Sequence, residues 1–369
     1  MRITHIIIGA LMATLPACAK NNTIRTSGNP ILPEFHADPE VLYSEQTQLF
    51  YIYSTTDGAP GWGGYYFTVF SSPDLTQWQH EGIMLDLGTD QVPWATGNAW
   101  APCIIERREG DGWKYYFYYS GHDPKTNRKA IGVAVADSPT GPFTDHGTPI
   151  ITDADRPQEA RGGQAIDVDV FHDPLSGKYY LYWGNGFMAG AELADDMLSI
   201  KPGTTRDLTP EGGTLGDYAY REAPYVFFRN GTYYFLWSVD DTGSPNYHVA
   251  YGVATSPLGP VTVAPDPIVL IQDPDNGIYG PAHNSVLQIP GHDEWYIVYH
   301  RINPAYLDRD RGPGFHRQVC IDHLYFNDDG TIRRVTPTQE GVEPVKMKGN
   351  GWEYFDKPFR LPLQKNKDS

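Results

Sequence analysis

Positive charge is scarce in this chain of 369 residues. Lys and Arg number 28 against 45 Asp and Glu, which gives a formal net charge of -17 at pH 7. A surface with this balance repels the phosphates of nucleic acids and the headgroups of anionic membranes. The composition therefore argues against nucleic acid as a partner and favours an uncharged one.

Cysteine is also rare, with three residues in the whole chain: Cys18, Cys103 and Cys320. None of them stands in a Cys/His cluster with the spacing of a zinc site. The sequence therefore predicts no zinc centre. Nothing in the spacing of Cys103 and Cys320 decides whether they form a disulfide, and both states stay open.

The apolar stretch at the N-terminus is too short to span a bilayer as a helix. Residues 1–18, MRITHIIIGALMATLPAC, combine a basic residue, a short apolar stretch and small residues, which is typical of a secretion signal. Their last four residues resemble the lipobox of bacterial lipoproteins, in which the Cys is lipidated and becomes the mature N-terminus. We therefore expect an exported protein, periplasmic or at the cell surface and attached to the outer membrane through a lipidated Cys18. An ordinary cleaved signal is the alternative.

Helical periodicity is missing from every long stretch of the sequence. Aromatic residues are plentiful instead, at 13% of the chain with 25 Tyr and 9 Trp, and 38 Gly and 31 Pro supply many turns. Aromatic residues are favoured in strands, and their rings can also stack on sugars. The composition therefore predicts an all-β protein.

A pattern of polar or small start, apolar strand, turn and aromatic second strand recurs five times, about sixty residues apart. The repeats, counted at equivalent positions, start at Asp38, Ala101, Asp167, Glu222 and Ala282. Each repeat can hold about four short strands, which is the size of a propeller blade. We therefore predict a five-bladed β-propeller as a single domain over residues 30–345, with a linker at 19–29 and a C-terminal extension at 346–369. A β-sandwich or a parallel β-helix would contain strands but would not produce this repeat.

Three of the five repeats carry a carboxylate at their start, namely Asp38, Asp167 and Glu222. The other two carry Trp100 and His283, directly beside the Ala residues from which these repeats were counted. The first strand of each blade lines the central channel of a propeller, so these residues face one funnel. Grouping acids at a narrow axis costs repulsion and desolvation, which a structural repeat does not require. We interpret the three acids as catalytic, and independent capping of turns by each acid is the alternative.

Two carboxylates on opposite sides of a pocket suit the cleavage of a glycosidic bond. One carboxyl group stays protonated and donates its proton to the leaving oxygen. The other is ionised and removes a proton from the attacking water. A third acid near the donor would raise the donor's pKa by repulsion between like charges.

Six segments, in chain order, resemble the signatures of glycoside hydrolase family 43. They are HADPEV (36–41), WAP (100–102), IDVDVF (166–171), EAPYVFFRNGTYYFLWS (222–238), GPAHNSV (280–286) and FHRQVCIDHLYFNDDG (315–330). The resemblance covers nearly all of residues 30 to 340. It implies a five-bladed propeller and a hydrolase that inverts the configuration at the anomeric carbon, without a covalent intermediate.

The resemblance also implies roles for single residues. Asp38 matches the general base, Glu222 the general acid, and Asp167 the residue that modulates the acid's pKa, although Asp169 stands close enough to compete with Asp167. Contacts with the substrate are expected from Trp100, Arg317, Phe35 and Asn185.

No cofactor is expected to be required for this chemistry. His283 matches the His through which some family members hold a calcium ion or a water cluster on the propeller axis, and a buried, hydrogen-bonded His without metal is the alternative. Trp62 and Tyr65 either project from a loop of the first blade to the pocket rim or pack within that loop.

The substrate follows least directly from the sequence. We expect an exo-acting α-L-arabinofuranosidase on plant-type polysaccharides or oligosaccharides, with β-xylosidase and β-galactofuranosidase kept open. The signatures of the five-bladed β-fructosidases, Asn-Asp-Pro, Arg-Asp-Pro and Glu-Cys, are absent from the corresponding places. A glycan-binding lipoprotein without activity is the alternative from another class, but all three acids are present.

Overall fold

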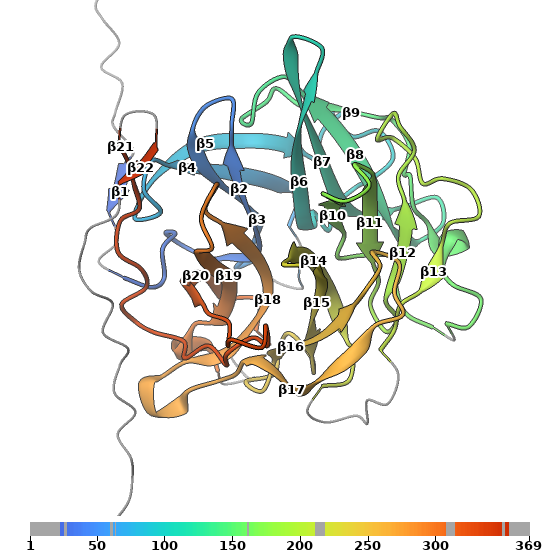
Figure 1. Cartoon of the computed structure of the whole chain (residues 1–369). Helices are drawn as coiled ribbons and strands as arrows, with labels where there is room; N and C mark the ends of the chain where they lie inside the picture. The colour runs from blue at the N-terminus through green and yellow to red at the C-terminus, as the bar shows by residue number, and fades with distance from the viewer. Residues whose placement is uncertain are drawn as a thin grey trace, which may run out of the picture.

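Five antiparallel sheets surround a central axis in the structure, a computed structural model (Figure 1). The residues it describes are 23–25, 28–59, 62, 64–160, 162–210, 218–307, 314–348 and 351–353. The predicted all-β, five-bladed propeller is confirmed. The predicted secretion signal, including Cys18, lies outside the described residues.

The strands run outward from the axis in chain order within each blade. Blade 1 holds β2 (His36–Ser44), β3 (Leu49–Thr56), β4 (Tyr66–Ser72) and β5 (Gln77–Asp86), with β1 (Thr23–Arg25) at its outer edge. Blade 2 holds β6 (Trp100–Glu109), β7 (Gly112–Asp123), β8 (Arg128–Ala136) and β9 (Thr144–Asp145). Blade 3 holds β10 (Asp169–His172), β11 (Tyr179–Trp183), β12 (Ala189–Glu192) and β13 (Arg206–Asp207).

Blades 4 and 5 complete the ring. Blade 4 holds β14 (Glu222–Arg229), β15 (Thr232–Val239), β16 (His248–Ala254) and β17 (Thr262–Leu270), and blade 5 holds β18 (Tyr279–Gln288), β19 (Trp295–Ile302) and β20 (Arg317–Leu324). A separate hairpin follows, β21 (Lys346–Lys348) with β22 (Gly351–Glu353). The described helices are three 3-10 turns at Asp153–Asp155, Pro274–Asn276 and Pro304–Tyr306. Within the described part of the chain, no helix has the length and apolar character to cross a membrane.

Blade 5 has three strands where the repeat predicted about four. The N-terminal segment lies along its outer strand, because the backbone N–H of Ile31 donates to the carbonyl of Val319 at 2.9 Å. The side chain of Asn29 adds two bonds to the backbone of Ile321, accepting from its N–H at 2.8 Å and donating to its carbonyl at 3.0 Å. The two ends of the propeller are therefore joined by residues that precede the first blade.

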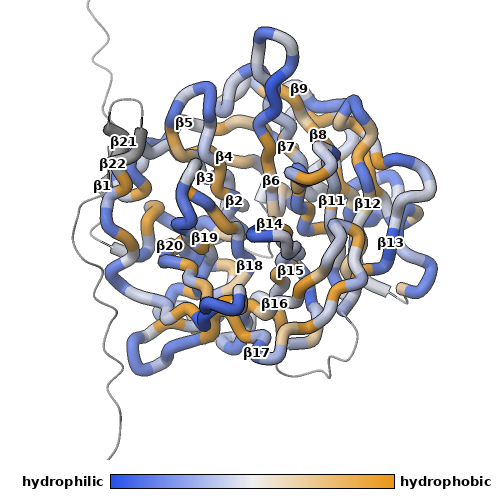
Figure 2. Tube along the Cα trace, in the orientation of Figure 1, coloured by the Kyte–Doolittle hydropathy of each residue, from blue (hydrophilic) through white to orange (hydrophobic). Residues whose placement is uncertain are grey.

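Each blade is apolar on both faces, and one apolar cluster fills each of the five interfaces between blades. Strand β7 shows why, because side chains alternate between the two faces of a sheet. Tyr115, Phe117 and Tyr119 pack toward blade 1, whereas Tyr116 and Tyr118 pack toward blade 3. The many aromatic residues are thus used mainly to fill the wedges between blades. The hydrophobic segments lie in the strands and the hydrophilic ones in the outer loops (Figure 2).

A bulge interrupts the inner strand near the axis in four blades, and the corresponding residue of every blade has a positive φ. These five residues are Asp38 (51°), Ala101 (41°), Asp167 (60°), Ala223 (58°) and His283 (48°). Non-glycine residues seldom adopt this conformation, and it is found mostly where the surrounding structure enforces it. The structural repeat therefore places Ala223 and His283, and not Glu222 and Ala282, in register with Asp38, which corrects the sequence alignment of blades 4 and 5 by one residue.

The backbone N–H of four of these positive-φ residues donates to a side chain of the preceding blade. The four acceptors hold equivalent positions on the second strand of their blades, where each pairs with the first-strand residue directly before the bulge. They are Thr55 for Ala101, Ser120 for Asp167, Ser238 for His283, and His300 for Asp38. Gly184 holds this place on blade 3, where its φ of 126° disfavours a side chain and any Cβ would collide with the carbonyl oxygen of Phe187. The N–H of Ala223 faces the carboxylate of Asp167 instead and lowers its pKa. One acid is thereby built into the ring of contacts between blades.

Candidate active site

The inner strands converge on one pocket near the axis. It is lined by Asp38, Trp100, Asp167, Glu222 and His283, so all five residues predicted at the starts of the repeats meet there. Its volume is about 220 Å³. This is below the roughly 300–1,000 Å³ of pockets for drug-sized ligands, so it suits one sugar ring rather than several.

The bulges explain how neighbouring residues can both reach this pocket. A bulge sets two residues of one strand against one residue of its partner, which re-aims their side chains. On blade 3, where the described inner strand has no bulge, Asp167 has the same positive φ and lines the pocket together with Ile166. Glu222 comes from the position before the bulge, as Trp100 does on blade 2, whereas Asp38 comes from the bulge itself. The three acids therefore reach the pocket from two positions of the repeat: Asp38 and Asp167 are the positive-φ residues of their blades, and Glu222 precedes that residue.

Asp38 is 5% exposed and surrounded by donors. Its Oδ1 lies 2.9 Å from Nη1 of Arg317 and 3.2 Å from Nδ1 of both His283 and His300, and its Oδ2 accepts from the hydroxyl of Thr55 at 2.7 Å. Burial alone would raise the pKa of Asp38, but Arg317 and the two His residues together hold the pKa well below its usual range. Asp38 is therefore ionised at neutral pH.

Arg317 is itself held by a second buried carboxylate. Nε and Nη2 of Arg317 donate to Asp57 at 2.9 and 3.2 Å, and the backbone N–H of Arg317 donates to the same carboxylate at 2.9 Å. Nη1 also donates to Thr242 at 3.1 Å. Arg317 lines the pocket, as the sequence predicted, but its guanidinium already donates hydrogen bonds to Asp38, Asp57 and Thr242.

Glu222 has a different environment, with neutral donors in contact. Tyr247 donates to Oε1 at 2.8 Å, and the amide of Asn185 donates to Oε2. Burial raises the pKa of Glu222, and the charges of Asp38 and Asp241 add to this effect against Tyr247 and Arg221, which lower it. Glu222 therefore retains its proton to higher pH than an exposed Glu.

Asp167 shares the pocket with Glu222. Burial raises its pKa well above the usual value, and the negative charges of Glu222 and Asp38 raise it further. Two close carboxylates cannot both ionise easily, so the pair holds a proton between them. Asp169 does not line the pocket, and its Oδ2 accepts from the backbone N–H of Val226 at 2.8 Å. Of the two candidates on blade 3, Asp167 is thus the one at the pocket.

The remaining predicted residues are placed as follows. Asn185, Trp100 and Trp62 line the pocket. Phe35 is not in the lining and packs edge-on against Tyr306 and His316, with ring centroids 5.5 and 5.0 Å apart. Tyr65 also lies outside the lining and is 55% exposed.

Cys103 and Cys320 are both buried and free, so the question left open by their spacing is answered against a disulfide.

Two states were open for His283, a residue that holds an axial calcium ion or water cluster and a buried, hydrogen-bonded His without metal. Its Nδ1 faces Asp38, and burial lowers its pKa to about 4, so it is neutral at pH 7. Calcium takes six to eight oxygen ligands, and among the described residues no group of three or more His, Cys, Asp and Glu is arranged to hold a metal. The side chains around His283 therefore do not fit a calcium ion held by protein oxygens, and no catalytic step is assigned to one.

Several residues of the site were not predicted from the sequence. They are Thr55, Asp57, His300 and Tyr247, which support the acids, and Gln164, Arg221, Asp241 and Thr242, which line the pocket. A signal for Thr55 and His300 existed, because a polar residue follows the aromatic run of the second strand in each repeat except blade 3. Asp57 and Tyr247 lie in segments without any recurring pattern.

A deep pocket with one ionised carboxylate facing two carboxyl groups of raised pKa, on a five-bladed propeller, defines a glycoside hydrolase. The sequence profile of "Glycosyl hydrolases family 43" matches residues 27–332. The chain belongs to this family.

The chain is also similar to curated proteins that are named as glycosidases. A β-D-galactofuranosidase of Aspergillus niger is 36% identical over 342 residues, which are 89% of this chain and 90% of the relative. Arabinoxylan arabinofuranohydrolases of Paenibacillus polymyxa and Bacillus subtilis are 27% and 28% identical, and the matches cover 74% and 75% of this chain. This chain spans only 44% and 56% of the length of these two relatives.

Solved structures agree in the fold. A thermostable family-43 glycoside hydrolase superposes with a TM-score of 0.71 at 30% identity, covering 86% of this chain and 99% of the other. A β-xylosidase/α-arabinofuranosidase from a compost metagenome, in a calcium-free complex with xylotriose, has a TM-score of 0.67 at 26% identity and covers 85% of this chain and 98% of the other.

The charge balance around Asp38 gives a first prediction. Arg317→Met should leave Asp38 and Asp57 buried without their cation, and destabilise the protein by about 3–5 kcal/mol at neutral pH. In the wild type the pKa of Asp38 lies below its unfolded value, so the carboxylate stabilises the fold above that value. In the variant the pKa lies above it, so the deficit in unfolding free energy should grow from pH 5 to pH 8. Urea unfolding at both pH values measures this.

Arg334→Met is the matched control, because it breaks an exposed ion pair with Asp266 at 3.2 Å. It should cost less than about 1 kcal/mol at either pH. A deficit for Arg317→Met that is equally small, or equal at both pH values, would contradict the buried charge balance.

Proposed function

We propose that this protein is an exo-acting, inverting furanosidase that removes terminal α-L-arabinofuranosyl residues from plant-type glycans. The observation that carries the proposal is the opposed ionisation of the acids: Asp38 has a lowered pKa, whereas Glu222 and Asp167 have raised ones. An ionised base and a protonated acid in one pocket are what glycoside hydrolysis requires.

In the proposed mechanism Asp38 removes a proton from water as the water attacks the anomeric carbon. Arg317, His283 and Thr55 hold its carboxylate in place, and Nδ1 of His300 accepts from its backbone N–H. Their donors also limit its basicity, so Asp38 is ionised at every pH at which the enzyme would work.

Glu222 donates its proton to the leaving oxygen at the same time. Asp167 and Glu222 hold one proton between them, because the charge of either carboxylate opposes ionisation of the other, and Asp167 also faces the N–H of Ala223 directly after Glu222. Asp167 thus acts on the acid both through charge and through position. The pocket's volume of about 220 Å³ supports removal of single terminal sugars.

A second candidate substrate is a terminal β-D-galactofuranoside, favoured by the 36% identity to the galactofuranosidase over most of both chains. The two sugars have the same ring configuration and differ in the exocyclic arm, where galactofuranose carries one more CHOH group. A pocket for one ring can therefore serve the other if it has room for the arm. β-Xylosidase activity stays a further alternative, as relatives of 27% identity are named xylosidase/arabinosidase.

A panel of nitrophenyl glycosides tests the function directly. The α-L-arabinofuranoside should be hydrolysed with the highest kcat/KM, followed by the β-D-galactofuranoside and then the β-D-xyloside. NMR of the first-formed sugar should show inverted configuration. A preference for the galactofuranoside would move the assignment to the second candidate, and inactivity on all three would contradict a glycosidase of this class.

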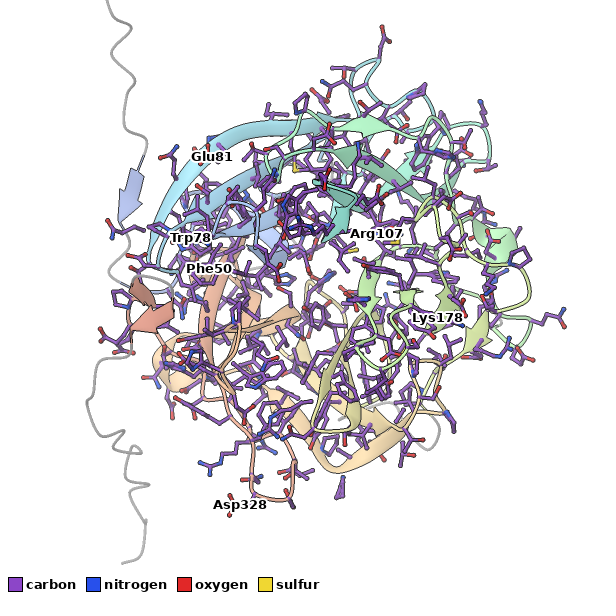
Figure 3. All side chains as sticks on the ribbon, turned by 45° about the horizontal axis from the view of Figure 1, so that its top comes forward. Phe50, Trp78, Glu81, Arg107, Lys178 and Asp328 are labelled. Carbon is purple, nitrogen blue, oxygen red and sulfur yellow. The ribbon has the colours of Figure 1, made fainter. Side chains whose placement is uncertain are left out.

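Glu222→Ala should lower kcat/KM on an unactivated oligosaccharide by about 10²–10⁴, because no proton reaches the leaving oxygen. A dinitrophenyl glycoside should lose far less, since its leaving group needs little protonation. Steady-state kinetics on both substrates measures the difference. Glu81→Ala removes an exposed carboxylate on the outside of blade 1 (Figure 3) and should change neither rate. Equal loss on both substrates would contradict Glu222 as the acid.

We further propose that the protein is exported and held at the membrane through a lipidated Cys18. The support is the sequence of residues 1–18 alone. In a bacterial host the full-length protein should partition into the detergent phase of a Triton X-114 extract, and Cys18→Ser should move it to the aqueous phase. Recovery of the wild type in the aqueous phase would leave only a cleaved signal.

A further inference from the structure

An ion pair between Arg221 and Asp241 stands at the mouth of the pocket. Nη2 of Arg221 lies 3.3 Å from Oδ2 of Asp241, and both residues line the same pocket as Glu222. Their side chains are 43% and 62% exposed, whereas Asp38, Asp167 and Glu222 are between 5% and 7% exposed. The pair therefore lies toward solvent, above the three buried acids.

Arg221 is fixed beside the acid by its backbone. Its N–H donates to the carbonyl of Ser238 at 2.9 Å, and its carbonyl accepts from the N–H of Gly186 at 2.7 Å. Asp241 is oriented by the N–H of Gly243, which donates to its Oδ1 at 3.0 Å. The pair is thus held in place by the same backbone that presents Glu222, on blade 4.

One donor of this pair has no partner. Nε of Arg221 is shielded from solvent and makes no hydrogen bond with any described residue, while Nη2 is engaged with Asp241. A buried donor left unpaired costs free energy, so Arg221 gains a hydrogen bond if its exposed side chain turns Nε toward a ligand in the pocket.

The place of the Arg221–Asp241 pair relative to Glu222 decides which part of the substrate the pair would bind. The acid must touch the glycosidic oxygen, so the reacting sugar lies on the buried side of Glu222 and the leaving sugar on the exposed side. Resting on the proposed function, we infer that Arg221 and Asp241 bind the leaving sugar and select glycans by the residue that follows the terminal one.

The chemistry of the pair specifies the kind of sugar. A guanidinium donates and a carboxylate accepts, so together they match adjacent hydroxyl groups, which can do both. Because the two charges offset each other, the pair fits a neutral sugar better than a uronic acid. The leaving residue is therefore a neutral sugar with free vicinal hydroxyl groups.

Arg221→Gln and Asp241→Asn test this with two substrates of the same terminal sugar. On an oligosaccharide each variant should lose about tenfold in kcat/KM, the usual effect of a hydrogen bond to a charged group, mainly through KM. On the nitrophenyl glycoside, whose leaving group has no hydroxyl, KM should change less than about twofold. Arg334→Gln, from the exposed pair with Asp266, is the control and should change neither.

A second readout separates this role from a structural one. Asp241 raises and Arg221 lowers the pKa of Glu222, which also faces Asp38, Asp167 and Tyr247. The alkaline limb of kcat/KM on the nitrophenyl glycoside should therefore move to lower pH in Asp241→Asn and to higher pH in Arg221→Gln.

Equal losses on both substrates, or no loss on either, would overturn the inference. A wild type that hydrolyses no glycoside would overturn the proposed function instead, and this result is read before any variant is made.

Discussion

In four of the five blades one hydrogen bond joins the start of the inner strand to the blade before it, and the arrangement of the pocket depends on these four bonds. Each is donated by a residue of positive φ, a conformation that would not persist without such a restraint. The bulges they stabilise turn successive side chains toward the axis. Packing between blades holds the ring together, but these hydrogen bonds near the axis orient the side chains of the acids.

Blade 3 shows how chemistry enters a structural repeat. Where the other blades offer a hydroxyl or an imidazole, Gly184 offers nothing, and the carboxylate of Asp167 fills the place. The acid that tunes Glu222 is therefore also a structural member. Asp38 has a similar double dependence, because the hydroxyl of Thr55 donates to its carboxylate and accepts from the N–H of Ala101 on the next blade.

Much of this could be predicted from the sequence, because the repeat itself was visible. The period gave the number of blades, and the position of each acid within its repeat placed Asp38, Asp167 and Glu222 in one pocket. The one-residue shift in blades 4 and 5 was not predictable, since a bulge leaves no local pattern. Asp57 and Arg221 were also missed: Asp57 meets Arg317 of blade 5 only when the ring closes, and Arg221 meets Asp241 from the opposite end of the β14–β15 hairpin. Phe35 shows the opposite case, in which nearness in sequence to Asp38 did not bring the side chain into the pocket.

The junction between the N-terminal segment and strand β20 of blade 5 has a consequence for how the chain folds. Asn29 and Ile321 are separated by 292 residues in sequence, yet their bonds close the ring. Contacts at such separation form late, after the chain's local hairpins, because the entropy of closing the long loop must be overcome first. The fifth blade is synthesised last and lacks a fourth strand of its own. A chain whose two ends have not met therefore carries an open sheet edge at β20, and the pocket, which draws residues from all five blades, is incomplete until the ring closes.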